Sequence, residues 1–170
     1  KFQGKYVEAE PLYARATEIW EKALGPEHPT VATVLNNRAL LLTAQGRYAE
    51  AEELYKNALD IREEALGPHH PDVADSLNSR AVLLYRQGMY AEAEPLFERS
   101  QAIREKVLNP EHPDVANSLN NRAELLQAQG KHDEAIPLLE RALVIRMKKL
   151  GEAHNDTVST QECLESVRNK

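Results

Sequence analysis

Four histidines recur at a constant interval and are the first candidates for metal chemistry. His28, His70, His112 and His154 each stand 42 residues after the one before. If each interval is one structural unit, neighbouring imidazoles stand on the order of 10 Å apart, the spacing of packed helices. Zinc holds its nitrogen ligands at about 2.0–2.1 Å, so one ion cannot bridge two of these side chains. The adjacent pair His69–His70 rarely suits one ion either. The spacing therefore predicts no metal site.

Nucleophiles and paired acids give no better support for catalysis. Four serines occur at repeat or helical spacing only, with no associated histidine or carboxylate: Ser76, Ser79, Ser100 and Ser118. Acid pairs such as Glu50–Glu52 are copies of one solvated face, repeated at Glu92–Glu94. Cys163 is the single cysteine, and we expect a small buried apolar group rather than a reactive thiol. We therefore predict no catalytic residue, no cofactor and no enzymatic activity.

The composition argues against nucleic acid as a partner and against insertion into a membrane. The chain has 170 residues, and its net charge of -6 is spread along the sequence, which argues against binding to nucleic acid phosphates. No apolar run approaches the roughly 18–20 residues needed to cross a bilayer, so we do not expect membrane insertion. A single cysteine cannot form an intramolecular disulfide, which favours a cytoplasmic location.

Glycines and prolines mark the repeated elements that position these side chains. The segment Gly25-Pro26-Glu27-His28-Pro29 recurs at residues 67–71 and 109–113, and in decayed form at 151–155. A second column consists of Gly4, Gly46, Gly88 and Gly130. Helix breakers at such regular intervals predict identical supersecondary units.

Between these breakers the apolar residues recur every three or four positions, which is the period of a helix. In the unit of residues 25–66, the pattern predicts a helix A over residues 31–45 and a helix B over residues 48–66. Each His-Pro pair is predicted to open a helix A, with proline in the first turn and Asp72 or Asp114 beside the helix N-terminus. Neither helix can bury its apolar stripe alone, so the pairs must stack.

The predicted fold is all-α, a right-handed solenoid or superhelix of antiparallel helix pairs in a single domain, residues 1–170. Residues 1–24 are predicted to form helix B of a truncated repeat. Three full repeats follow, at residues 25–66, 67–108 and 109–150. Residues 151–170 are predicted to form a terminal or capping helix, because Glu162, Glu165 and Arg168 make its face more polar.

The repeat resembles the tetratricopeptide family. The order Leu35-Asn36-Asn37-Arg38-Ala39, followed by Gly46-x-Tyr48-x-x-Ala51, is similar to the small and large packing residues of that family. The 42-residue spacing and the order Ala-Leu-x-Ile-Arg-Glu-x-x-Leu-Gly-Pro-x-His-Pro resemble the kinesin light chain subgroup. Similar arrays occur in receptor-like proteins that carry an NB-ARC domain. The resemblance covers essentially the whole chain and implies a scaffold that binds a protein or peptide segment, without indicating which one.

By this resemblance, the A helices line a concave groove, and an asparagine column looks into it: Asn36, Asn78 and Asn120. An amide both donates and accepts hydrogen bonds, which suits contacts with a peptide backbone. The alternative is that these amides join neighbouring helices. Flanking positions that vary between repeats are candidates for selectivity: Thr33, Asp75, Asn117, Leu40, Val82, Glu124, Tyr85, Arg86 and Gln127.

Three arginines, Arg38, Arg80 and Arg122, stand where leucine is usual in kinesin light chains. One interpretation packs their stems between helices and pairs their heads with a helix B carboxylate such as Glu52, Glu94 or Glu63. The other has the heads reach the groove and bind an acidic peptide. The constancy of this column favours packing.

The leading functional prediction is a protein-interaction module that binds a peptide in the groove. One alternative is the sensor array of an NB-ARC-type receptor, whose NTPase would lie outside this chain because no phosphate-binding loop is present. Another is a structural spacer that self-associates through its ends. Trp20 stands in the column of Arg62, Arg104 and Arg146, where it either anchors a partner or covers an open end.

Overall fold

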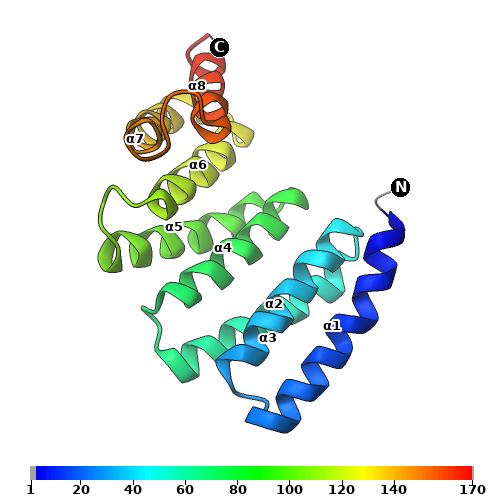
Figure 1. Ribbon diagram of the computed structural model, residues 1–170. Helices are drawn as coiled ribbons and strands as arrows, with labels where there is room; N and C mark the ends of the chain where they lie inside the picture. The colour runs from blue at the N-terminus through cyan, green and yellow to red at the C-terminus, as the bar shows by residue number, and fades with distance from the viewer. Residues whose placement is uncertain (1–2, 170) are drawn as a thin grey trace. The chain divides into compact units, whose positions relative to one another are not determined.

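The computed structural model describes residues 3–169, with side chains from residue 9 onward, and contains only helices in that range. The helices, which run antiparallel to their neighbours in each pair (Figure 1), are α1 (Gln3–Leu24), α2 (Pro29–Ala44), α3 (Tyr48–Leu66), α4 (Pro71–Arg86), α5 (Tyr90–Val107), α6 (Pro113–Ala128), α7 (His132–Leu150) and α8 (Asn155–Arg168). The prediction of an all-α repeat fold is confirmed.

The observed helices match the two predicted types. Helices α2, α4, α6 and α8 are A helices, and α1, α3, α5 and α7 are B helices. Helix α3 has the predicted bounds, whereas α2 begins two residues earlier than expected because the His-Pro pair is already part of its N-terminus. Gly46, with φ of 79°, follows helix A, and Gly67, with φ of 85°, follows helix B. Both turns need a left-handed backbone, which glycine adopts without strain.

The repeated histidines cap the A helices. In His28, His70, His112 and His154, Nδ1 accepts a hydrogen bond from the backbone N–H two residues later, at 3.2 Å in each case. Proline occupies the first helical position after the first three. The predicted role at the entry to helix A is therefore confirmed, and the caps satisfy N–H groups that lack a partner within the helix.

The chain divides into two compact units, Lys1–Gly88 and Met89–Lys170, which hold α1–α4 and α5–α8 respectively. Each unit has an apolar core between its second and third helices. In the first unit, Ala39 and Leu42 of α2 pack with Ala51 and Tyr55 of α3, and a second cluster joins Val31, Ala32 and Leu35 to Ala58. The second unit repeats both clusters 84 residues later in the sequence.

Candidate functional site

A buried arginine on helix B holds the A helices in place. Arg62 of α3 is buried, and its Nη1 donates to the carbonyl oxygen of Asp72 and to Oγ of Ser76, both at 2.8 Å. Its Nη2 donates to Oγ1 of Thr33 at 3.1 Å. Desolvation lowers the pKa of this guanidinium, while the charges of Asp72 and Asp75 oppose the shift. One side chain of α3 thus bonds to both α2 and α4.

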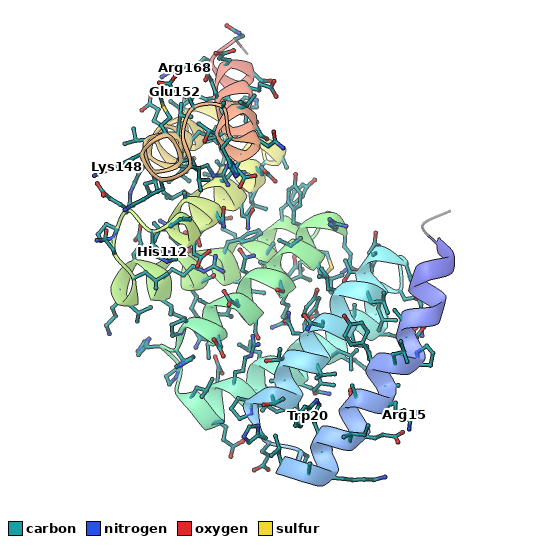
Figure 2. The ribbon with its side chains drawn as sticks, viewed as in Figure 1. Arg15, Trp20, His112, Lys148, Glu152 and Arg168 are labelled. Atoms are coloured by element: carbon teal, nitrogen blue, oxygen red, sulfur yellow. The ribbon has the colours of Figure 1, made fainter. Side chains whose placement is uncertain are left out.

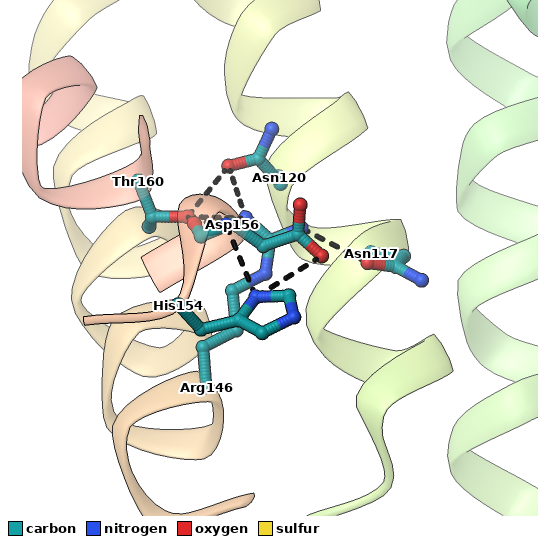
Figure 3. Close-up of polar contacts among 6 residues, drawn as sticks. All are labelled: Asn117, Asn120, Arg146, His154, Asp156 and Thr160. Atoms are coloured by element: carbon teal, nitrogen blue, oxygen red, sulfur yellow. Dashed lines mark hydrogen bonds and ion pairs between the residues drawn. The ribbon is translucent and has the colours of Figure 1, made fainter. Parts of the chain in front are cut away.

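The second unit contains the same arrangement around Arg146 (Figure 3). Arg146 is buried on α7, and it donates to Oδ1 of Asn117 at 2.9 Å and to Oδ1 of Asn120 at 3.3 Å. It also donates to the carbonyl oxygen of Asp156 at 3.1 Å and to the hydroxyl of Thr160. Two predicted groove residues, Asn117 and Asn120, are therefore engaged in joining α6 to α7 and α8.

This buried column was not predicted, although the sequence contains a signal for it. Arg104 also is buried and donates to Oγ of Ser118 at 2.8 Å. In all three copies a hydroxyl residue follows the arginine by 14 positions, namely Ser76, Ser118 and Thr160. Trp20, which stands in the arginine column on α1, is exposed (Figure 2).

The predicted asparagine column lies at the edge of the seam between helices rather than on their open face. Asn36, Asn78 and Asn120 are all half-buried. Asn120 donates from Nδ2 to Glu124 at 2.6 Å, while its Oδ1 accepts from Arg146. Asn36 differs, because its Oδ1 is buried without a hydrogen-bond partner among the described residues.

The arginine column at 38, 80 and 122 has different contacts in each repeat. Nε and Nη2 of Arg80 donate to Oε1 of Glu52 at 2.9 and 2.8 Å. Arg122 donates to Glu98 and to Gln101, each at 2.8 Å, rather than to the expected Glu94. Nε of Arg38 is buried without a partner among the described residues. Arg80 and Arg122 therefore make contacts of the packing type, to α3 and α5 respectively.

The open face of α2 is a stripe one position away from the asparagine column. On α2 this exposed stripe consists of Thr33, Asn37, Leu40 and Ala44. The spacing of four, three and four residues places them on one side of a helix. Thr33 and Leu40 were among the candidates, whereas Asn37 was missed in favour of its neighbour Asn36.

A pocket of about 280 Å³ opens on this stripe in the first unit, between α1, α2 and α4. Its lining includes Tyr13, Asn37, Leu40 and Arg86, and the Leu40 side chain is 58% exposed. Arg86 is exposed and makes no hydrogen bond or ion pair with the residues that the structure describes. An apolar wall and an exposed cation therefore share one concave site.

The remaining predicted groove residues do not line this pocket. On α4, Asp75 is exposed and Tyr85 is half-buried. Gln127 of α6 donates to Sγ of Cys163 in α8 at 3.1 Å, so this half-buried cysteine contributes to packing in the second unit. Glu124 is exposed, yet desolvation of its carboxyl group raises its pKa, while the hydrogen bond from Asn120 and the charge of Arg146 oppose the shift.

Ion pairs also join side chains on the surface of the second unit. Nζ of Lys148 lies 2.6 Å from Glu111, and Nη2 of Arg168 lies 2.5 Å from Glu140. Figure 2 labels Lys148 and Arg168. Among the described residues, no group of three or more histidine, cysteine or acidic side chains is placed to hold a metal ion. In the same range, none of the helices has the length and apolarity needed to span a membrane.

Comparisons with known proteins agree with this geometry. The tetratricopeptide repeat model matches residues 1–42, 30–106, 72–148 and 114–162. A putative kinesin light chain from Podospora anserina with nearly identical TPR-like repeats is 30% identical with a TM-score of 0.81, covering 98% of this chain and 79% of that one. BtubC (BKLC) from P. vanneervenii is 25% identical with a TM-score of 0.87, covering 98% of this chain and 66% of that one.

A more distant structure, a double mutant of MamA from RS-1, is 13% identical with a TM-score of 0.57 and covers 99% of this chain and 93% of that one. It supports the fold alone. A search of curated proteins finds no significant match. With family matches along most of its length and two kinesin-light-chain-like structures that superimpose on nearly all of it, the chain belongs to the tetratricopeptide repeat family.

Proposed function

We propose that the chain is a protein-interaction module that binds a peptide segment along the exposed stripes of its A helices. Tetratricopeptide repeats typically serve as scaffolds for other proteins, which supports the general class. Within this chain, the pocket formed by Tyr13, Leu40 and Arg86 is the anchoring site that we propose.

The observation that carries the proposal is the pairing of Leu40 and Arg86 at one pocket. Neither residue type is needed by the fold at its position. The column of Leu40 contains Glu124 in a later repeat, and the column of Arg86 contains Ala44 and Ala128. An exposed leucine and an exposed arginine are therefore features of this surface, and they suit an apolar side chain followed by a carboxylate.

One neighbouring amide supplies main-chain contacts in this proposal. Asn37 is exposed and lies in the pocket lining, so it can bond to an extended backbone without selecting its side chains. Asn36 is not part of this contact, because its Oδ1 is buried. Asn120 is less suited, since its amide is already bonded to Glu124 and Arg146.

The test is to select peptides from a randomised library on the chain and to measure their affinity by isothermal titration calorimetry. We expect enrichment of an apolar residue beside an acid, and at least tenfold weaker binding to Arg86→Ala and to Leu40→Glu. Asp60→Ala, an exposed change on α3, is the control and should bind as the parent does. Equal affinities of all three variants, with folding retained, would exclude this pocket.

A further inference from the structure

The open face of α6, in the second unit, differs in chemistry from the open face of α2. It consists of the residues that stand two repeats after the α2 stripe, namely Asn117, Asn121, Glu124 and Ala128. Three of them are exposed, and Asn121 is half-buried. Glu124 stands in the column of Leu40. Where the first unit presents an exposed leucine, the second unit therefore presents a carboxylate.

The Glu124 carboxylate is held by a side chain that two other helices fix in place. Nδ2 of Asn120 donates to Oε1 of Glu124 at 2.6 Å. Oδ1 of the same amide accepts from Arg146 of α7 and from the hydroxyl of Thr160 of α8, both at 3.3 Å (Figure 3). The amide of Asn120 is thus bonded at both ends. The carboxylate is therefore positioned before a partner binds, which lowers the entropic cost of binding.

The charges around Glu124 do not fully compensate its carboxylate. Desolvation raises the pKa of Glu124, and this effect outweighs both the hydrogen bond from Asn120 and the charge of Arg146. Arg146 directs its own hydrogen bonds at other acceptors, among them Asn117 and the carbonyl oxygen of Asp156. A cation brought by a partner would favour the ionised carboxylate and offset its desolvation.

The basic residues of α6 and α8 contact other helices. Arg122 of α6 donates to Glu98 and Gln101 of α5. Arg168 of α8 pairs with Glu140 of α7. The α8 positions that continue the stripe hold Ser159, Cys163 and Ser166, none of which is basic. Within α6 and α8, the open face is therefore negative at Glu124.

We propose that the open face of the second unit binds a lysine or arginine side chain of a peptide segment, with Glu124 as the residue that selects it. This inference rests on the proposed function as a peptide-binding module. Asn117 and Asn121 lie on the same face as Glu124 and can bond to the main chain beside the cation. Leu40 in the same column suits an apolar side chain, so the residue in this column decides which side chain each unit binds.

The first experiment selects peptides from a randomised library on the whole chain and on its Glu124 variants. The parent should enrich lysine or arginine, and Glu124→Gln should lose that enrichment. Glu124→Leu should enrich an apolar residue in its place, because it restores the side chain of the first unit. Glu134→Gln is the matched control, an identical change at an exposed position of α7, and should select as the parent does.

The second experiment measures the most enriched basic peptide by isothermal titration calorimetry, beside a derivative in which norleucine replaces the basic residue. Norleucine keeps an apolar stem but lacks the charge. The parent should bind the derivative about tenfold more weakly. Glu124→Gln should bind both peptides equally. It should stay folded by circular dichroism, because the glutamine carbonyl can still accept from Asn120.

The outcomes separate this inference from the proposed pocket at Leu40 and Arg86. Peptides with an apolar residue beside an acid, but without a base, would overturn this inference alone. An equal loss on norleucine substitution in the parent and in Glu124→Gln would overturn it too, since the cation would then contact another residue. Enrichment of a base that depends on Glu124 but not on Leu40 or Arg86 would support it and count against that pocket. Enrichment of neither motif would overturn both proposals.

Discussion

Nη1 of Arg62 lies 2.8 Å from Oγ of Ser76, although the two residues belong to different helices, α3 and α4. The same guanidinium also reaches Thr33 of α2 at 3.1 Å. Three helices of the first unit are thus joined by one buried charge whose desolvation is offset by oxygen acceptors. The contact explains why arginine occurs at this position on α3, α5 and α7.

Replacing Arg62 by methionine should destabilise the chain. The substitution keeps most of the apolar stem but leaves the carbonyl of Asp72 and the hydroxyl of Ser76 without their buried donor. We expect the free energy of unfolding to fall by about 2 kcal/mol. Urea denaturation, monitored by circular dichroism, measures this free energy. The control is Arg15→Met on α1, an exposed change that should stay within about 0.5 kcal/mol of the parent. Similar values for both variants would contradict this role for Arg62.

The repeat fold could be predicted almost completely from the sequence, whereas the polar contacts between helices could not. Glycine, proline and the helical period determine where each helix begins and ends, and these signals are local. The sequence alone indicates a solvated position at Arg62, because arginine usually is exposed. Its burial depends on acceptors 10 and 14 residues later, on the next helix. Only the recurrence of Arg62–Ser76 as Arg104–Ser118 could have indicated that contact.

Removing a histidine cap should weaken one helix A. In His70→Ala, the backbone N–H of Asp72 loses its acceptor, the Nδ1 atom at 3.2 Å. We expect a loss of about 1 kcal/mol in the free energy of unfolding. His70→Asn should recover most of it, because asparagine is a good cap. The neighbouring exposed residue provides the control, and His69→Ala should have little effect. A comparable loss in both alanine variants would show that Nδ1 of His70 is not the stabilising group.

Replacing arginine by leucine should change stability in opposite directions at two positions of one arginine column. Arg38 has a buried Nε without a partner among the described residues, so Arg38→Leu should leave stability unchanged or raise it by about 1 kcal/mol. Arg80→Leu should lower it by about 1–2 kcal/mol, because Glu52 is mostly buried and loses two hydrogen bonds. Thermal and urea unfolding of the two variants measure the difference. If both variants change stability in the same direction, the contacts of Arg80 do not distinguish it from Arg38.

The sequence indicates the helices on which the candidate site lies, but not which of their residues face the solvent. The resemblance placed an asparagine in the groove, and the doublet Asn36-Asn37 offered two choices that differ by about 100° around the helix. The structure exposes Asn37 and half-buries Asn36. The pocket at Leu40 also needs Tyr13 and Arg86 from two other helices. Such a combination depends on how α1, α2 and α4 pack, which the pattern of one repeat does not contain.

The contributions of two glutamates to stability should change with pH in opposite directions. Desolvation raises the pKa of Glu124, so its contribution to stability is complete below its unfolded pKa of about 4.3 and is lost as the pH rises through the folded value. Glu124→Gln removes this loss, and its stability relative to the parent should therefore increase between pH 4 and pH 7.

Glu111 provides the control for that measurement. The hydrogen bond from Lys148 lowers the pKa of Glu111, so its contribution is present above the unfolded pKa and is lost as the pH falls through the folded value. Relative to the parent, Glu111→Gln should therefore lose stability as the pH rises from 3 to 5. Urea denaturation at each pH gives both difference curves. Because the parent's other carboxyl groups cancel in each difference, curves of the same sign would mean that desolvation does not dominate at Glu124.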